Sequence, residues 1–296
     1  MPELPEVETI KRGLEKLIVK RTIESITSDN PKSFPNLKSD VRSFACSSKV
    51  LFVRRRAKVL IIGLDSGYGL VIHLKMTGQL VFASGSQHFG AGHPSASLIN
   101  SLPDKSTRVI IKFTDGSNLF FNDQRKFGWM KLVPLPEITN LNFFANLGPE
   151  PLEESFNWQQ LKRQMTKRPN SAVKPVLMDQ SIVAGIGNIY ADESLWGSKI
   201  NPAIRVCQLR DKDYRNLTRS IKEILELSLL RGGSTDRNYV DAEGRRGNYL
   251  EFARVFRREG QPCLRCSKTI VKIRLSGRGT HFCPHCQPLP AESKRV

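Results

Sequence analysis

Four cysteines near the C-terminus have the spacing of a metal site. Cys263 and Cys266 form one C-x2-C pair, Cys283 and Cys286 form a second, and sixteen residues lie between the two pairs. Two such pairs joined by a hairpin place four thiolates in a tetrahedron, and zinc is the ion that this set usually holds. Because four sulfur ligands leave no open coordination position, we expect one zinc ion with a structural role and no catalytic one.

The segment between the two cysteine pairs is basic, and it contains Lys268, Lys272, Arg274, Arg278 and His281. A zinc hairpin with an arginine at its tip can contact phosphates or a nucleic-acid groove. The alternative is a charged face that contacts only solvent. The whole chain favours the first interpretation, because 46 Lys and Arg against 28 Asp and Glu give a net charge of +18. Such a surplus predicts a polyanionic partner, nucleic acid first and an anionic membrane second.

The N-terminus, Met1-Pro2-Glu3, is a second candidate for chemistry. Methionine before a small residue is normally removed, which would leave Pro2 with a free secondary amine. At the positive end of the helix expected to follow, this amine would stay neutral and nucleophilic, and Glu3 could act as a general acid or base. An amine that attacks C1′ of a sugar forms an iminium, which allows base loss and then strand cleavage. By itself, however, a Met-Pro start is usually only structural.

Composition and patterning exclude other classes. No apolar run reaches the ~20 residues of a membrane span, and the acidic start is not that of a signal peptide, so we expect a cytoplasmic protein. The 296 residues suffice for one large domain or two ordinary ones. We interpret the two isolated cysteines, Cys46 and Cys207, as small buried hydrophobes.

Several motifs, taken together and in order, resemble those of the formamidopyrimidine-DNA glycosylase family of bacterial repair enzymes. They are MPELPEVET at 1–9, RRAK at 55–58, HLKMTG at 73–78, DQRKFG at 123–128, LGPEP at 147–151, KP at 174–175, GIGNIY at 185–190 and GRGTHFC at 277–283. The resemblance covers nearly the whole chain.

The resemblance implies roles in catalysis for five residues. Pro2 is similar to the family's Schiff-base nucleophile, Glu3 to the proton donor for glycosidic cleavage, and Glu6 to a second carboxylate near the site. Lys58 resembles the residue that assists β-elimination, and Arg278 the one that assists δ-elimination. The chemistry agrees, since a cation stabilises a departing phosphate.

The resemblance also implies contacts with DNA. Lys58, His73, Asn188 and Arg278 resemble the family's phosphate clamp. Met76, Arg125 and Phe127 resemble the trio that fills the gap left by a flipped nucleotide. For Met76 and Phe127 the alternative is core packing. The chain departs from the family at Ser106, where a histidine is frequent, and at Asn170, where a lysine is frequent; each change is expected to remove one DNA contact.

The elements that must position these residues divide the chain into two halves. Helical spacing of apolar residues predicts a helix over 3–19, and short runs at 49–53, 59–64 and 70–74 predict strands. Asp115-Gly116 is expected to join strands 108–113 and 118–121 as a hairpin, and 84–106 is expected to be a surface loop. Beyond a Pro- and Gly-containing linker the pattern turns helical, most clearly over 211–231.

We therefore predict an α+β protein of two domains. Residues 1–133 form the N-terminal catalytic helix and an antiparallel β-sandwich, and 134–151 form a linker that acts as a hinge. Residues 152–248 form a helix–two-turns–helix region with a lesion-recognition loop at 232–248, and 249–288 form a zinc finger, with a hairpin over 251–287. The tail, 289–296, is disordered. We expect DNA to cross a basic cleft between the domains.

The resulting functional hypothesis is a monomeric, bifunctional glycosylase for damaged double-stranded DNA. It would remove 8-oxoguanine and formamidopyrimidines through a Schiff base on Pro2 and then cleave the strand by β,δ-elimination. One rival is an endonuclease VIII-like glycosylase for oxidised pyrimidines, which Leu4 and the Arg125-Lys126-Phe127 run disfavour. The other is a non-catalytic zinc-ribbon DNA-binding protein, which leaves the Pro2-Glu3 start and Lys58 unexplained.

Overall fold

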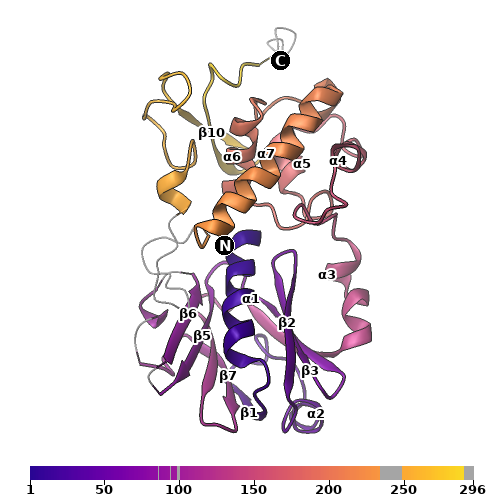
Figure 1. Cartoon of the computed structure of the whole chain (residues 1–296), viewed down its shortest axis with the longest axis vertical. Coiled ribbons are helices and arrows are strands. Elements are labelled where there is room, and N and C mark those ends of the chain that lie inside the picture. Colours follow the sequence, from indigo (N-terminus) through magenta and orange to yellow (C-terminus); the bar gives the residue numbers. More distant parts are fainter. Residues whose placement is uncertain (86, 94, 99–100, 234–248, 290–296) are drawn as a thin grey trace. The chain divides into compact units, whose positions relative to one another are not determined.

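The computed structural model of the chain (Figure 1) describes residues 1–85, 87–93, 95–98, 101–233 and 249–289. It divides into two compact units, which are described separately. Unit 1 comprises Met1–Ala145 with Leu229–Asn248, and unit 2 comprises Asn146–Ser228 with Tyr249–Val296. Most of the lesion-recognition loop expected at 232–248, and nearly all of the tail expected at 289–296, lie outside the described residues. None of the described helices is long and apolar enough to cross a membrane.

Unit 1 begins with the predicted helix, α1 (Leu4–Ile18). Its apolar face is buried at Val7, Ile10, Leu14 and Ile18, which keep the spacing that predicted the helix. Pro5 is accommodated because the first turn needs no hydrogen bond from its nitrogen. The helix contacts strands of two sheets, β2 and β3 of one and β5 and β6 of the other.

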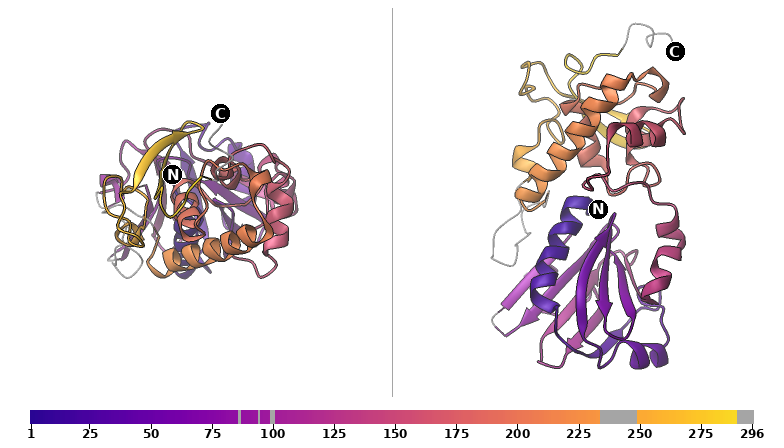
Figure 2. Two further views of the ribbon diagram at one scale, coloured as in Figure 1. Left: turned by 90° about the horizontal axis from the view of Figure 1, so that it is seen from above. Right: turned by 45° about the vertical axis from the view of Figure 1, so that its right-hand side comes forward.

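The two sheets are antiparallel and form the predicted sandwich (Figure 2). One has the order β1-β7-β8-β5-β6 and the other β2-β3-β4-β9. Their bounds are β1 (Ile23–Ser28), β5 (Gly78–Ser84), β6 (Gln87–Gly92), β7 (Thr107–Phe113) and β8 (Asn118–Asp123), and β2 (Val50–Arg56), β3 (Val59–Leu64), β4 (Tyr68–His73) and β9 (Trp129–Pro134). One core contains Val53 and Ile72 from the second sheet with Phe82 and Phe121 from the first. The hairpin expected around Asp115-Gly116 is β7–β8.

The interpretation of residues 84–106 as a surface loop is wrong for its first part. β6 pairs with β5 from Ser84↔Gln87 to Gln79↔Gly92, and Phe89 and Ala91 are buried. The glycines that suggested turns serve close packing instead. A Cβ on Gly90 would lie 2.9 Å from the carbonyl oxygen of Leu98, in the short helix η1 (Ala96–Leu98).

Three further elements, in two regions of the chain, differ from the sequence-based expectation. Helix α2 (Lys38–Phe44) interrupts the strand-rich half and was not predicted. The start of the expected linker is ordered as η2 (Leu135–Asn140) and α3 (Asn142–Ala145). Ile138 of η2 is buried against Val59 and Val71, so this part of the segment packs on the four-stranded sheet.

Unit 2 is helical, as predicted. It contains α4 (Trp158–Met165), α5 (Val173–Met178), α6 (Asn188–Gly197), α7 (Asp211–Leu230) and the short helices η3 (Val206–Gln208) and η4 (Tyr249–Phe252). The expected helix 211–231 is α7, which buries Leu217, Ile221, Ile224 and Leu225. These side chains share a core with Tyr190 and other residues of α5 and α6.

The zinc-finger region is the hairpin of β10 (Val271–Leu275) and β11 (Arg278–Phe282). Its turn residues, Ser276 and Gly277, both have positive φ (47° and 76°), as a tight two-residue hairpin turn requires. Of the isolated cysteines, Cys46 is half-buried against the sandwich core, but Cys207 is exposed, so its interpretation as buried is wrong. In the short helix η3 its neighbour Val206 takes the inward position.

Candidate active site and zinc centre

The start of α1 brings three of the predicted catalytic residues together. Glu3 is the N-cap, Pro2 precedes it, and the Glu6 carboxylate accepts the Glu3 N–H at 2.8 Å. Pro2 is buried, and Glu3 and Glu6 are only 4% and 6% exposed. A carboxylate at this position satisfies a backbone donor that the helix itself leaves open, which holds the first turn beside the Pro2 nitrogen.

Lys58 and His73 lie side by side at one end of the four-stranded sheet. Ala57 and Lys58 form the turn between β2 and β3, in which Ala57 adopts a φ of 52°, and Val59, the next residue, pairs with His73 on β4. Lys58 is 4% exposed and His73 5%. The arrangement brings two of the four expected clamp residues together.

The ring of His73 is neutral at physiological pH. Burial, together with the charges of Lys75 and Lys58, lowers the pKa of His73 to about 3. Its Nδ1 accepts the backbone N–H of Lys75 at 3.0 Å, which leaves the proton on Nε2. His73 can therefore donate one hydrogen bond to an anion but carries no charge to attract it.

The trio of Met76, Arg125 and Phe127 lies at the surface of unit 1. Met76 is 37% exposed and Phe127 55%, so the alternative that they pack in the core is wrong. The Arg125 guanidinium carbon lies 4.9 Å from the centre of the Phe127 ring, and both side chains line a hollow shared with Asn30 and Lys32. We call these three exposed side chains the wedge, after the role that the family resemblance implies.

One residue that sequence reasoning did not single out organises this wedge. The buried Asp123 carboxylate accepts the N–H groups of Arg125 (3.2 Å) and Gly128 (2.6 Å) and contacts the hydroxyl of Thr77. It therefore joins the loop that carries Arg125 and Phe127 to the one that carries Met76. Its place at the start of the DQRKFG motif was the available clue.

In unit 2 the expected phosphate ligand Asn188 is the first residue of α6. The turn before it is shaped by Gln180, which accepts the Gly185 N–H at 2.9 Å and donates to the Ile186 carbonyl at 2.8 Å. The Asn188 Oδ1 is buried and accepts no hydrogen bond within the described part of the chain. A helix N-terminus with an adjacent side-chain amide suits an anion.

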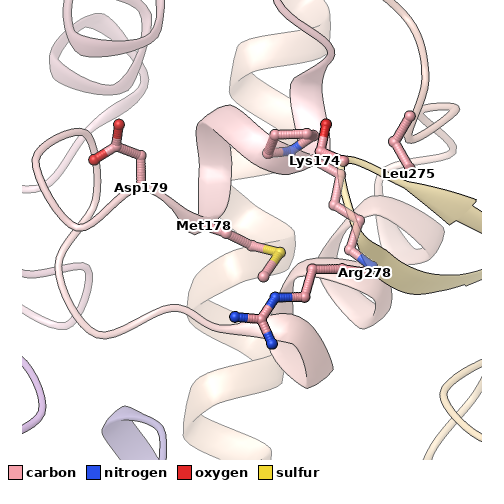
Figure 3. A pocket seen from close by; sticks show the side chains of 7 residues that line it. Lys174, Met178, Asp179, Leu275 and Arg278 are labelled. Carbon is pink, nitrogen blue, oxygen red and sulfur yellow. The ribbon is translucent and has the colours of Figure 1, made fainter.

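Arg278 is exposed at the start of β11. It lines a hollow of unit 2 with Lys174, Met178, Asp179 and Leu275 (Figure 3). Lys268, Lys272 and Arg274 of the same basic segment are also exposed.

The expectation that His281 belongs to the exposed basic segment is wrong. It is only 4% exposed, and its backbone N–H donates to Asp192 of α6 at 2.9 Å. It therefore faces the helical core and cannot contribute to the basic surface that the sequence suggested.

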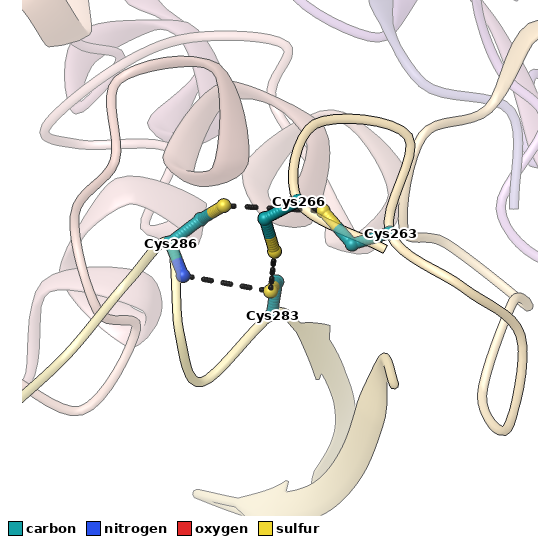
Figure 4. Close-up of side chains that lie close together, drawn as sticks. All are labelled: Cys263, Cys266, Cys283 and Cys286. Atoms are coloured by element: carbon teal, nitrogen blue, oxygen red, sulfur yellow. Dashed lines mark hydrogen bonds between the residues drawn. The ribbon is translucent and has the colours of Figure 1, made fainter. Parts of the chain in front are cut away.

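The four predicted zinc ligands come together (Figure 4). Their sulfur atoms all lie within 4.8 Å of one another, with 4.0 Å between Cys263 and Cys286 and 3.5 Å between Cys266 and Cys283. Burial opposes ionisation of Cys263, but hydrogen bonds from the Arg265 N–H and the Trp196 indole outweigh it and lower the pKa of Cys263 to about 6. An all-sulfur set with such donors fits one structural zinc ion.

Comparison with known proteins agrees with this geometry. Residues 1–130 match the family model of the formamidopyrimidine-DNA glycosylase N-terminal domain, 147–239 that of the H2TH domain of the same proteins, and 260–289 a zinc finger found in FPG and IleRS.

Relatives of known name match along almost their full length. The formamidopyrimidine-DNA glycosylase of Pelotomaculum thermopropionicum is 39% identical over 97% of this chain and 99% of its own. That of Ligilactobacillus salivarius is 38% identical with the same coverage. Among solved structures, Lactococcus lactis Fpg in complex with DNA containing an abasic site has a TM-score of 0.85 at 33% identity, covering 97% of this chain and all of that one. MutM in complex with DNA containing carbocyclic 8-oxo-G has a TM-score of 0.84 with the same identity and coverage.

Proposed function

Because the chain belongs to the formamidopyrimidine-DNA glycosylase family, we propose that it excises oxidised purines from duplex DNA and then cleaves the abasic strand. The substrates that we assign are 8-oxoguanine and formamidopyrimidines. The observation that carries the proposal is the position of Pro2 beside two buried carboxylates, Glu3 and Glu6, at the N-terminus of α1. Since the relatives come from bacteria, we place the reaction in the bacterial cytoplasm.

Base excision begins at the Pro2 nitrogen. Removal of Met1, whose side chain is 48% exposed, converts this nitrogen from an amide to a secondary amine. Its lone pair attacks C1′, the electron pair of the glycosidic bond leaves with the base, and the departing base takes a proton from the acid form of Glu3. The nitrogen then loses its proton, the C1′–O4′ bond opens with its electron pair on O4′, and O4′ takes up a proton, which leaves an iminium between Pro2 and C1′. The Glu6 carboxylate, bonded to the Glu3 N–H, holds the reacting turn in place.

Strand cleavage follows in two eliminations. Loss of the C2′ proton gives an enamine, which expels the 3′ phosphate with the C3′–O electron pair and regenerates a conjugated iminium. Loss of the C4′ proton then allows the 5′ phosphate to leave with the C5′–O pair, and water hydrolyses the iminium to free Pro2. We assign stabilisation of the first leaving group to Lys58 and of the second to Arg278, because a fixed cation stabilises the developing charge.

DNA binding rests on the remaining residues. The His73 Nε2 proton and the amide N–H groups of Asn188 are suited to donate to phosphate oxygens without net charge. The exposed trio of Met76, Arg125 and Phe127 is suited to replace the stacking and pairing that a flipped nucleotide loses.

The test is borohydride trapping on a duplex that contains 8-oxoguanine. We expect a covalent protein–DNA adduct, and peptide mass spectrometry should place it on residue 2. An adduct on a lysine side chain would reject the assignment of Pro2. The absence of any adduct, with DNA binding intact, would favour the non-catalytic zinc-ribbon alternative.

A panel of lesion duplexes separates the remaining rival. The purine enzyme should release 8-oxoguanine and formamidopyrimidines in preference to oxidised pyrimidines such as thymine glycol. The reverse preference would indicate an endonuclease VIII-like activity.

A further inference from the structure

A buried ion pair lies where helices α5 and α6 meet the zinc hairpin. The Lys174 Nζ lies 2.8 Å from the Asp192 Oδ1, and their side chains are 1% and 0% exposed. The same Nζ donates to the Gly279 carbonyl at 2.9 Å and to the Thr280 hydroxyl at 2.8 Å. One ammonium group thus binds two consecutive residues of β11.

The second oxygen of Asp192 binds the next residue of the strand. Its Oδ2 accepts the backbone N–H of His281 at 2.9 Å and lies 3.1 Å from the His281 Nδ1. On the other side of the ring, Nε2 lies 3.2 Å from the Oε2 of Glu259. The three residues that follow Arg278 are therefore all held by the pair of Lys174 and Asp192.

Stability alone does not account for this arrangement. Desolvating two charges is expensive, and apolar side chains of similar volume often stabilise a protein as much or more. Apolar contacts, however, tolerate sliding, whereas hydrogen bonds to successive backbone groups set the register of a strand. The pair therefore determines where β11, and with it Arg278 at its first position, lies on the helical core.

Asp192 also lies on the helix that begins with Asn188, four residues earlier in α6. Positions i and i+4 share one face of a helix. A single rigid helix therefore carries one expected phosphate ligand, Asn188, and the carboxylate that locates the other, Arg278.

We propose that Asp192 is a positioning residue that holds Arg278 in register with Asn188 and thereby determines whether the second elimination follows the first. This inference rests on the proposed lyase function. When the register is lost, the 3′ phosphate still leaves, because Pro2 and Lys58 lie in unit 1, whereas expulsion of the 5′ phosphate loses its cation. The excess product would be the unsaturated aldehyde left after β-elimination alone.

Two variants at one position separate the two sides of the His281 ring. In His281→Asn the amide nitrogen takes the place of Nδ1 and keeps a donor for Asp192. In His281→Gln the amide nitrogen reaches the place of Nε2, so the side chain keeps its contact with Glu259 but loses the one with Asp192, and only the backbone N–H of residue 281 still donates to Asp192. Each is assayed on duplex DNA with a preformed abasic site, and the products of β- and β,δ-elimination are separated by gel electrophoresis.

We expect His281→Asn to keep the product ratio of the unmodified protein, and His281→Gln to raise the β-only fraction several-fold. Asp192→Asn should do the same, since its amide cannot accept the His281 N–H and bind Lys174 at once. The proposal would be overturned if all three variants gave the product ratio of the unmodified protein. It would also be overturned if His281→Asn and His281→Gln raised the β-only fraction by the same factor.

The matched control is Leu217→Ala, which removes a fully buried side chain from α7 without touching the hairpin. It should lower the melting temperature but leave the product ratio unchanged. Borohydride trapping is measured in parallel and should proceed in every variant. If the unmodified protein itself traps no DNA, the proposed function fails. If trapping is normal but the product ratio stays unchanged in the variants, only the positioning role of Asp192 fails.

Discussion

The indole N–H of Trp196 donates to the Sγ of Cys263 at 3.4 Å, which joins the last turn of α6 to a zinc ligand. The Arg265 guanidinium covers the same ring, with its central carbon 3.9 Å from the ring centre. Because thiolate and cation both contact Trp196, its fluorescence should report on the metal site.

We expect chelation of zinc to change the tryptophan emission of the protein. All three tryptophans of the chain lie among the described residues, and of these Trp196 packs with the cysteines, whereas Trp129 and Trp158 pack in other clusters. Trp196→Phe should therefore abolish most of the change, while Trp158→Phe should preserve it. An undiminished change in Trp196→Phe would show that the reporter lies elsewhere.

Zinc removal should also abolish binding to damaged duplex DNA. The hairpin that carries Arg278 has few buried apolar side chains of its own. The small hydrophobic cluster beside it consists of Cys263 and Cys283 with Trp196, Val255 and Ile270. Metal binding supplies much of the folding free energy of such a small region. Titration of a fluorescent lesion duplex with metal-free and zinc-reconstituted protein tests this. Equal affinity would exclude the hairpin from the binding surface.

The variant Phe127→Ala should show whether the Phe127 side chain acts on DNA or packs in the protein core. A surface truncation usually changes the free energy of unfolding by no more than ~0.5 kcal/mol, so melting should stay near that of the unmodified protein. Base excision should fall strongly, because the enzyme must supply the energy of flipping, while cleavage of a preformed abasic site should fall little.

The control is Phe121→Ala on the adjacent strand β8, where the side chain is fully buried. Its loss should cost ~3–5 kcal/mol of stability and lower both activities together. If Phe127→Ala behaved in the same way, the wedge assignment would be wrong.

The neutral His73 predicts a pH-dependent stability. Its pKa of about 3 in the folded protein lies below the ordinary value of 6.5, so unfolding takes up a proton between these values. The stabilisation is fully present above pH 6.5 and is lost as the pH falls toward 3, by up to about 1.4 kcal/mol per pH unit.

His73→Gln should flatten this dependence while keeping a side-chain donor near the position of Nε2. Urea denaturation at pH 5 and pH 7 gives the two free energies of unfolding for each protein. An unchanged difference between the two pH values in His73→Gln would show that another group titrates.

Features that depend on neighbours in the chain were predictable from the sequence. The spacing of the four cysteines, the apolar periodicity of α1 and α7, and the Asp115-Gly116 hairpin all appear in the structure where they were expected. Each is specified within a few turns or one hairpin, so the local pattern contains the necessary information.

Features that depend on residues far away in the chain were not predictable from the sequence. His281 lies in a basic stretch of sequence that is typical of an exposed surface. It is buried against Asp192, which lies 89 residues earlier in the chain. Phe89 and Gly90 belong to a Gly- and Ser-containing stretch, which forms a strand by pairing with β5 and packs against α1 and η1.

The sequence by itself therefore determined the family resemblance, the metal ligands and the types of group available for chemistry. The tertiary structure alone decided that Lys174 and Asp192 form a buried pair, that Asp123 organises the wedge and that His73 is neutral. The physical reason is that desolvation and hydrogen-bond geometry depend on which atoms surround a group in space, and most of those atoms belong to residues far away in the chain.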